Sequence, residues 1–327
     1  MKLAKKAIIS IIAAAVLLVV VGVSLSVYFT WYMTDKKDTE ALYREHVNAV
    51  GYQNTIETAI PQTVIYNMIN EHFASALPEG KTSKKAIIIG YDGCRADILT
   101  EMQDGNSGIG AMLQDGASIN LAYCGGVNYP TTNTQDTSTA PGWCSILTGT
   151  WANVHGVTEN DVSKDLNTKT LLLSLTEQNI IDSAVFNTKW AGHFSRKDAT
   201  YLNEKQYAED NDLPVSYNKY KNDNATLEAT LAQLGNKDCA DFTFVIYEPT
   251  DAAGHGYGFS HNNPRYQKAF VKADAMCFET INTIKSRETF LQEDWLIVIT
   301  SDHGGYGTEH GYASLQERMT FIVANRF

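Results

Sequence analysis

The chain has 327 residues, 44% of them hydrophobic and 19% charged, which is the composition of an ordinary folded protein with one large or two modest domains. A formal net charge of −11 at pH 7 argues against a nucleic-acid-binding surface. Five cysteines without a closely spaced pair exclude a zinc knuckle, and we interpret them as structural, although one or two disulfides remain open.

The first 33 residues differ from the rest of the chain. Three lysines are followed by residues 7–33, which carry no charge and are numerous enough to cross a bilayer as a helix. The lysines favour a cytoplasmic amino terminus, with everything after the helix on the extracytoplasmic side. The alternative is a cleaved signal peptide, with Ser24 and Ser26 at the cleavage site. We favour an uncleaved anchor because the apolar run continues past these serines into the aromatic stretch VYFTWYM.

Residues 34–84 predict a polar, largely helical stalk and linker. Within it, TVIYNMINEHFASAL places five apolar side chains on one helical face, namely Ile65, Met68, Ile69, Phe73 and Ala76. We expect this face to pack on the following domain or on a partner helix. The stretch PEGKTSKK interrupts the periodicity, so we place the start of the main domain, residues 85–327, directly after it.

Within residues 85–327, short apolar runs alternate with amphipathic segments. Residues 85–91, 180–187, 241–247 and 294–300 are predicted to be buried strands. Residues 263–285 predict a helix, because apolar side chains recur there at helical spacing, at Phe270, Ala273, Cys277, Ile281 and Ile284. Such strands, separated by helices, indicate an α/β fold with a mostly parallel sheet flanked by helices on both faces.

Residues of metal-ligand type follow three of these strands. They are Asp92, Asp251, His255, Asp302, His303 and His310. Taken singly, each has an ordinary alternative as a helix cap or loop residue. Binding sites in doubly wound sheets form beyond the carboxyl ends of the strands, so we interpret the set as ligands of two metal ions. This mixture of oxygen and imidazole ligands suits zinc, and less commonly manganese or iron.

A candidate nucleophile lies in the stretch DTSTAPGWCSILTG. Thr139 comes just before a helix that we expect to start with Pro141. A hydroxyl there lies in the positive field of the helix amino terminus, which also favours an anionic phosphate. Coordination to a metal would lower the pKa of the hydroxyl further, and two ions suit an in-line phosphoryl displacement. The simpler alternative makes Thr139 a helix cap, with Ser138 as the second candidate nucleophile.

These motifs resemble the alkaline phosphatase superfamily and, within it, the nucleotide pyrophosphatase/phosphodiesterase branch. The resemblance rests on YDGCRAD, TSTAPGWCSILTGTWANVHGV, YEPTDAAGHGYG, TSDHGG and EHG, which keep the family's order over about residues 85–320. It implies an alkaline-phosphatase-like fold and a phospho-threonine intermediate at Thr139. The ligand sets that it implies are Asp251, His255 and His310 for one ion, and Asp92, Asp302, His303 and Thr139 for the other.

Some positions depart from the family's pattern. The family usually has Asn three residues after its nucleophile, donating to a phosphate oxygen, whereas this chain has Gly142. In this chain, backbone N–H groups or another side chain must then donate to the phosphate oxygen. Lys189 and His193, in KWAGH, stand where the family has a loop near the substrate, so we expect contact with the leaving group, the alternative being a plain surface loop. His155 resembles a structural histidine of the family and is left out of the site.

Three classes of function fit the sequence. Our prediction is a membrane-anchored, extracytoplasmic, two-metal phosphodiesterase or nucleotide pyrophosphatase acting on a phosphate ester. The second class is another member of the superfamily, a phosphomonoesterase, a sulfatase or a phosphoglycerol-type transferase. TAPGW lacks the residues of a sulfatase nucleophile motif. The third is a non-enzymatic metal-binding surface module, which the intact ligand set disfavours. The sequence indicates neither the natural substrate nor the oligomeric state.

Overall fold

The computed structural model describes residues 2–101, 107–127, 134–160 and 166–327. Within these residues the strands are β1 (Ile60–Pro61), β2 (Ser83–Tyr91), β3 (Ser118–Tyr123), β4 (Ala184–Thr188), β5 (Val215–Lys219), β6 (Phe242–Tyr247), β7 (Glu293–Thr300) and β8 (Met319–Ala324). They form one sheet in the order β1-β3-β8-β7-β2-β6-β4-β5. Neighbouring strands are parallel, except that β8 is antiparallel to β3 and β7. The predicted, mostly parallel sheet is confirmed.

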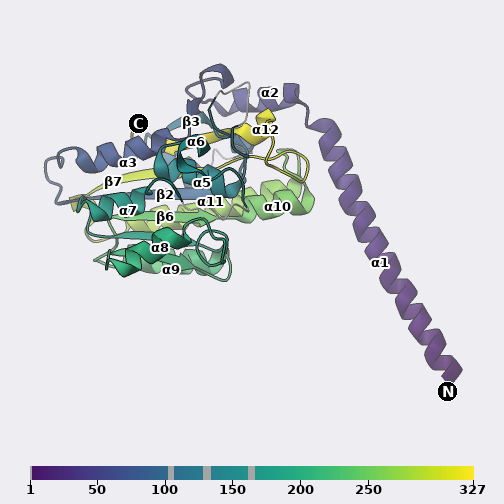
Figure 1. Cartoon of the computed structure of the whole chain (residues 1–327). Helices are drawn as coiled ribbons and strands as arrows, with labels where there is room; N and C mark the ends of the chain where they lie inside the picture. Colours follow the sequence, from purple (N-terminus) through teal and green to yellow (C-terminus); the bar gives the residue numbers. More distant parts are fainter. Residues whose placement is uncertain (1, 102–106, 128–133, 161–165) are drawn as a thin grey trace.

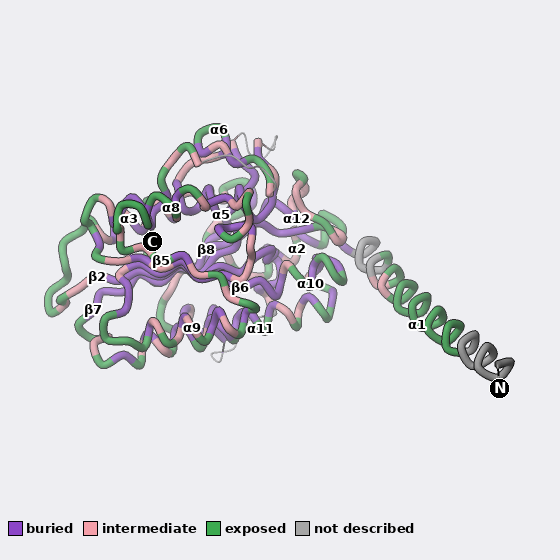
Figure 2. Tube along the Cα trace, turned by 60° about the horizontal axis from the view of Figure 1, so that its bottom comes forward, coloured by how far each residue is buried: buried purple, intermediate pink, exposed green. Residues whose placement is uncertain are grey.

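Helices cover both faces of this sheet (Figure 2). Those described are α1 (Lys2–Lys37), α2 (Glu40–Val50), α3 (Val64–Ala74), α4 (Gly108–Gln114), α5 (Thr139–Thr148), α6 (Ala152–His155), α7 (Leu171–Glu177), α8 (Leu202–Asp210), α9 (Asp223–Gly235), α10 (Pro249–Tyr257), α11 (Pro264–Lys285) and α12 (Leu315–Arg318). Residues of α3, α5, α7 and α8 pack on one face, and residues of α4, α9 and α11 pack on the other. The predicted α/β fold with two helical layers is therefore confirmed.

The central strand β2 shows why the sheet needs both layers. Ala86 and Ile88 belong to the core cluster under α3, α5 and α7, whereas Ile87 and Ile89 belong to the cluster under α4, α9 and α11. A strand covered on both faces is apolar at every position, which explains the uninterrupted run that marked it in the sequence. All five cysteines are buried free thiols, and four of them lie in these two clusters.

The predicted strands reappear as β2, β4, β6 and β7, and the predicted helix at 263–285 as α11. All five apolar residues that marked this helix are buried. The strands β1, β3, β5 and β8 were not predicted. The strand β5, VSYNK, lies at the edge of the sheet, where polar residues are tolerated. Its sequence therefore lacks the apolar run that marks a central strand.

The amino-terminal helix α1 runs away from the domain (Figure 1). In the described part of the chain it is the one helix long and apolar enough to cross a membrane, over Ile12–Thr30, where mean hydropathy is 2.6. Length and composition are the grounds for this statement, and a signal sequence near the amino terminus satisfies the same criteria.

The segment expected to be a stalk and linker, residues 34–84, packs on the domain over much of its length. On α2, Tyr43 and Val47 are buried in a cluster that includes Leu121 of β3. On α3, Ile65 and Ile69 join the main core, and β1 pairs with β3 in the sheet. These apolar contacts give the segment a fixed place beside the sheet, although the domain boundary at residue 85 stays a prediction.

Candidate metal centre

The three strands whose ends carry the predicted ligands lie side by side, in the order β7-β2-β6. They are mutually parallel, with Gly90 of β2 opposite Thr300 of β7 and Tyr91 opposite Tyr247 of β6. Their carboxyl ends therefore meet at one edge, as we predicted from the sequence. Asp92 follows β2 directly, α10 begins two residues after β6, and Asp302 is the second residue after β7.

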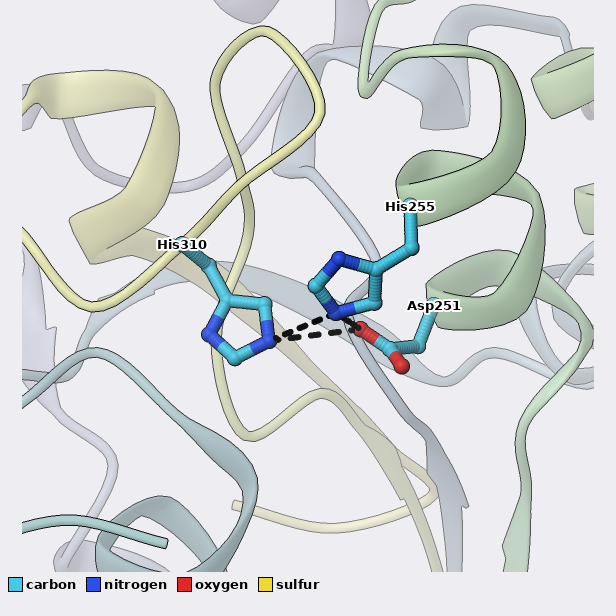
Figure 3. A group of neighbouring side chains, drawn as sticks. All are labelled: Asp251, His255 and His310. Carbon is cyan, nitrogen blue, oxygen red and sulfur yellow. Dashed lines mark hydrogen bonds and ion pairs between the residues drawn. The ribbon is translucent and has the colours of Figure 1, made fainter.

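One group of ligand-type side chains consists of Asp251, His255 and His310 (Figure 3). One turn of α10 separates Asp251 from His255, so both side chains project from the same face of the helix. His310 reaches them from the loop after β7. The two Nε2 atoms of the histidines lie 3.1 Å apart, and Asp251 Oδ1 lies 3.5 Å from one and 3.6 Å from the other.

The second group consists of Asp92, Asp302 and His303, all of them buried. His303 Nε2 lies 3.7 Å from Asp92 Oδ1 and 3.4 Å from Asp302 Oδ2. The backbone N–H of Gly93 donates to the other Asp302 oxygen, at 3.1 Å, and so fixes the orientation of that carboxylate. The structure therefore gathers the six predicted residues into the two sets of three that the family resemblance implied.

Backbone carbonyl groups orient all three histidines. The Nδ1 atoms of His255, His310 and His303 lie 2.9, 3.1 and 2.6 Å from the carbonyl oxygens of Thr308, Thr137 and Gly304, respectively. A carbonyl oxygen accepts only, so each Nδ1 carries the proton and donates it. Each Nε2 then presents a lone pair toward its group, which is the tautomer that binds a metal ion.

Several buried atoms of these groups have no hydrogen-bond partner among the described residues. They are Asp251 Oδ1, Asp302 Oδ2 and His303 Nε2. Burial raises the pKa of Asp92 and Asp302, and it raises the pKa of Asp251 to about 7. Buried polar atoms are otherwise almost always paired, so these unpaired donor atoms fit divalent cations. Imidazole nitrogens with carboxylate oxygens form a set that suits zinc.

Thr139 lies beside the second group. It is the first residue of α5, and its Oγ1 donates to Asp92 Oδ1 over 3.4 Å. The other oxygen of Asp92 accepts from Trp143 Nε1 at 3.3 Å. The helix starts two residues earlier than expected, because Pro141 fits anywhere in a first turn, where backbone N–H groups need no acceptor in the helix. The N-cap position belongs to Ser138, so the helix-cap alternative for Thr139 is wrong.

Asn160 lies beside the start of α5, and the sequence analysis did not single it out. Its Oδ1 accepts the backbone N–H of Ala140, at 2.8 Å, and this holds the carboxamide against the first turn of α5 next to Thr139. No local spacing connects Asn160 with Thr139. The sequence did contain one indirect signal. The family's Asn, three residues after the nucleophile, is missing from this chain, so another side chain was needed to donate an amide N–H to the phosphate.

Gly142 occupies the position where the family has that Asn, and it packs against Asp302. A Cβ atom at Gly142 would lie 2.8 Å from both Cβ and the carbonyl oxygen of Asp302. Its N–H donates to the carbonyl oxygen of Ser138, the N-cap of α5, at 2.9 Å, and its carbonyl oxygen accepts from Gln62 Nε2 at 3.2 Å. The structure therefore gives Gly142 a packing role and leaves it no free backbone donor for a substrate.

Lys189 lies near the centre among acidic residues. Its Nζ is 2.8 Å from Asp223 Oδ2 and 3.6 Å from Glu248 Oε2. Burial, together with the neighbouring charge of Asp92, raises the pKa of Glu248 to about 8. Lys189 thus balances negative charge beside the second group of ligands.

The structure does not bring His193 to the centre. Its side chain is fully buried among Phe186, Trp190 and Tyr201, and both ring nitrogens have no hydrogen-bond partner among the described residues. Contact with a leaving group, as expected from KWAGH, is not available to a side chain in this position. His155 is also buried away from the centre, bonded to Ser145 Oγ.

Comparison with known proteins identifies a family model and several solved structures that are similar to this chain. Residues 86–316 match the family model for type I phosphodiesterase/nucleotide pyrophosphatase. No curated protein matches the sequence significantly. Among solved structures, murine ectonucleotide pyrophosphatase/phosphodiesterase 5 is 20% identical, with a TM-score of 0.46, over 67% of this chain and 57% of that one. Phosphonoacetate hydrolase from Sinorhizobium meliloti 1021 is 18% identical, with a TM-score of 0.43, over 67% and 56%.

A third solved structure, the lipoteichoic acid synthase LtaP from Listeria monocytogenes, is 13% identical, with a TM-score of 0.44, over 79% of this chain and 71% of that one. The chain spans little more than half the length of the first two structures. The family model, in contrast, covers most of this chain and contains every residue of the two ligand groups. The chain therefore belongs to the type I phosphodiesterase/nucleotide pyrophosphatase family, within the alkaline phosphatase superfamily.

Proposed function

We propose that the protein is a membrane-anchored, extracytoplasmic phosphodiesterase or nucleotide pyrophosphatase that uses two divalent metal ions and a threonine nucleophile. The observation that carries this proposal is that two Asp–His groups lie at the carboxyl edge of three parallel strands, with the Thr139 hydroxyl beside the second group. Zinc is the metal that this ligand set favours. The lysines before the apolar helix α1 support an anchor with its domain outside the cytoplasm.

The ligand residues would hold one ion at each group. Asp251, His255 and His310 would bind the first, and Asp92, Asp302 and His303 the second, with Thr139 beside it. When bound, such a pair of ions stabilises negative charge on the attacking and leaving oxygens of a phosphoryl displacement. The chain contributes the fixed tautomers of the histidines and a largely buried second group, in which charge interactions are strong.

Thr139 is the proposed nucleophile. Asp92 accepts the hydrogen bond of its hydroxyl and so directs the oxygen, and the amino terminus of α5 favours the anionic phosphate. A bond forms between Thr139 Oγ and phosphorus as one ester oxygen leaves with its alcohol. Water then attacks the phospho-threonine, which restores the hydroxyl and releases a phosphomonoester.

Two neighbouring side chains complete the proposed site. Asn160 accepts from Ala140 through Oδ1, so its amide N–H groups can donate to a phosphate oxygen on Thr139. It would replace the Asn that the family has at the position of Gly142. We assign Lys189 to charge balance, because its ammonium group is already bound by Asp223.

The test compares three chromogenic substrates on the full chain in detergent micelles with added zinc. We expect bis-p-nitrophenyl phosphate to be hydrolysed faster than p-nitrophenyl phosphate, and p-nitrophenyl sulfate least. A chelator should abolish the activity. Faster hydrolysis of the monoester would overturn the phosphodiesterase assignment in favour of a phosphomonoesterase.

A further inference from the structure

A buried arginine connects the loops that carry the metal-ligand residues. Arg95 lies three residues after Asp92, and its side chain is fully buried. Its Nη1 donates to the carbonyl oxygen of Phe259, at 2.8 Å, just beyond the end of α10. The same nitrogen lies 3.5 Å from the carbonyl oxygen of Gly305, in the loop after β7. One guanidinium group therefore joins the three segments that follow β2, β6 and β7.

Two carboxylates hold this guanidinium group in place. Asp97 accepts from Nε at 2.9 Å and from Nη2 at 2.7 Å. Asp38 accepts from Nη1 and from Nη2, with 2.9 Å between Asp38 Oδ1 and Nη2. A buried guanidinium needs such partners, because an unpaired charge is costly in the interior. Asp38 thus fixes Nη1, the nitrogen that donates to Phe259.

Asp38 comes from outside the stretch that the family model matches. It is the first residue after α1, whereas the match begins at residue 86. Its side chain is nevertheless buried. Figure 1 shows α1 meeting the domain beside α2 and α12, and α1 also contacts α10, the helix that carries Asp251 and His255. The segment that follows the apolar helix is therefore tied to the loops of the candidate metal centre.

The ring of Phe259 packs against both histidines of the first ligand group. Its centroid lies 5.4 Å from that of His255 and 6.0 Å from that of His310, and the rings are nearly perpendicular, at 82° and 88°. Two glycines make room for it, because a Cβ atom at Gly254 or Gly305 would lie 2.2 or 2.3 Å from a ring atom of Phe259. The fully buried ring therefore limits where the two imidazole groups can lie.

We propose that Asp38, Arg95 and Phe259 are positioning residues of the first ligand group, so that the residue after the apolar helix sets how tightly this group binds its metal ion. The inference rests on the proposed function, in which this group holds one of two divalent ions. Asp38 fixes Nη1 of Arg95, Arg95 fixes the backbone of Phe259, and the Phe259 ring confines both imidazole groups. Loss of contacts that orient metal ligands typically costs about 10–100-fold in metal affinity.

The first test is a calorimetric titration of the full chain, in detergent micelles, with zinc. Asp38→Asn keeps the shape of the side chain but removes its charge and one of the two oxygens that accept from Arg95. We expect one of two zinc equivalents to bind about 10–100-fold more weakly and the other to keep its affinity. Full affinity for both equivalents in this variant would overturn the inference.

The matched control for this substitution is Glu293→Gln. Glu293 is a buried carboxylate paired with Arg287, and it lies at the start of β7, whereas the ligand residues follow the end of that strand. We expect the control to lower stability but to leave the affinity of both zinc equivalents unchanged. Equal weakening in Glu293→Gln and Asp38→Asn would show a general effect of lost stability and would overturn the inference.

The second test asks whether Asp38 acts through the Phe259 ring. Phe259→Leu keeps the carbonyl oxygen that accepts from Arg95 but removes the ring, so we expect the same zinc equivalent to be weakened. Phe242→Leu is the matched control, at a fully buried position at the start of β6, and should change neither equivalent. The double variant of Asp38 and Phe259 should lose no more affinity than the more affected single variant. Losses that multiply would overturn the proposed route through Phe259.

The same titrations separate this inference from the proposed function. An unsubstituted chain that binds no zinc would overturn both. Two equivalents in the unsubstituted chain, with unchanged affinities in Asp38→Asn and Phe259→Leu, would overturn the inference alone and leave the proposed function standing. In a His310→Gln background, which should keep only the ion of the second group, Asp38→Asn should have no further effect. A further loss there would overturn the assignment of Asp38 to the first group.

Discussion

His255 Nε2 and His310 Nε2 lie 3.1 Å apart. Each Nδ1 lies beside a backbone carbonyl oxygen, that of Thr308 or Thr137, and a carbonyl oxygen accepts only, so we assign the ring protons to the two Nδ1 atoms. Two lone pairs therefore face each other, with the Asp251 carboxylate 3.5 Å from the nearer nitrogen. A cation between these atoms converts a repulsive arrangement into an attractive one.

Removal of metal should therefore lower stability as well as activity. We expect a chelator to lower the melting temperature of the full chain, and zinc at about 100 times its dissociation constant to restore about 2.7 kcal/mol of unfolding free energy. Scanning calorimetry with and without zinc measures the effect. His310→Gln should lose one of two zinc equivalents in metal analysis, and retention of both would remove His310 from the proposed ligand set.

Single substitutions should show whether Thr139 or the neighbouring Ser138 is the nucleophile. Thr139→Ala removes the hydroxyl, so we expect kcat to fall by about 10³ or more, with the melting temperature nearly unchanged. A rapid acid quench with a substrate labelled at phosphorus should trap label on the unsubstituted chain and none on the variant. Ser138→Ala is the matched control, since Ser138 makes no side-chain cap bond. Loss of activity in the control, with activity kept in Thr139→Ala, would move the nucleophile to Ser138.

Asn160→Asp tests whether the carboxamide acts as a donor. Aspartate keeps the oxygen that accepts from Ala140, but it offers no N–H to a phosphate oxygen and adds a negative charge. We expect kcat to fall by about 10²-fold, which is the usual loss when one donor to a developing anion is removed. Asn160→Ala loses both functions and should also lower stability. A full kcat in Asn160→Asp would show that the phosphate finds its donors elsewhere.

The strand ends and their acids could be predicted because they depend on local sequence. Every residue of β6 and β7 is buried, as are residues 85–91 of β2, and the acids follow these strands within four residues, so the sheet edge was predictable without long-range information. Contacts between segments that are distant in the sequence could not be predicted in this way. The Asp38–Arg95 pair joins residues 57 positions apart, and Asn160 reaches Ala140 across 20 positions.

His193 shows how a position inferred from a family resemblance can mislead. We expected a substrate contact because KWAGH stands where the family has a loop near the substrate. Its environment, however, is set by aromatic side chains of other segments, among them Phe186 of β4 and Tyr201, and these enclose the ring completely. Neither neighbour is identifiable from the local pattern, so the sequence could not distinguish a core histidine from a substrate contact.

Gly142 should not tolerate the side chain that the family has at this position. Gly142→Asn would place Cβ 2.8 Å from the Cβ and carbonyl oxygen of Asp302, so that ligand must move. We expect a loss of about 1–3 kcal/mol in unfolding free energy and weaker binding of one metal equivalent. Denaturant unfolding and metal analysis measure the two effects. Gly235→Ala, where the nearest atom is 4.0 Å from the new Cβ, is the matched control and should leave both unchanged.

The buried histidines predict how stability depends on pH. Burial lowers the pKa of His193 to about 3 and that of His155 to about 4, whereas an unfolded chain has histidines near 6.5. The unfolded state thus binds more protons between these values. The stability that these two neutral histidines contribute is complete above pH 6.5 and falls as the pH decreases toward 4, by about 1.4 kcal/mol per pH unit for each histidine.

The two histidines differ in what surrounds them, so they give a matched pair of variants. His193 has no partner for either nitrogen, and His193→Phe should raise stability and remove its share of the acid dependence. His155 Nε2 lies 3.2 Å from Ser145 Oγ and its Nδ1 accepts from Val157 at 3.1 Å, so His155→Phe should destabilise the chain at every pH. Urea unfolding between pH 4.5 and 8 measures both, with zinc held constant. An unchanged acid slope in His193→Phe would mean that this ring is protonated in the folded chain, which its aromatic surroundings argue against.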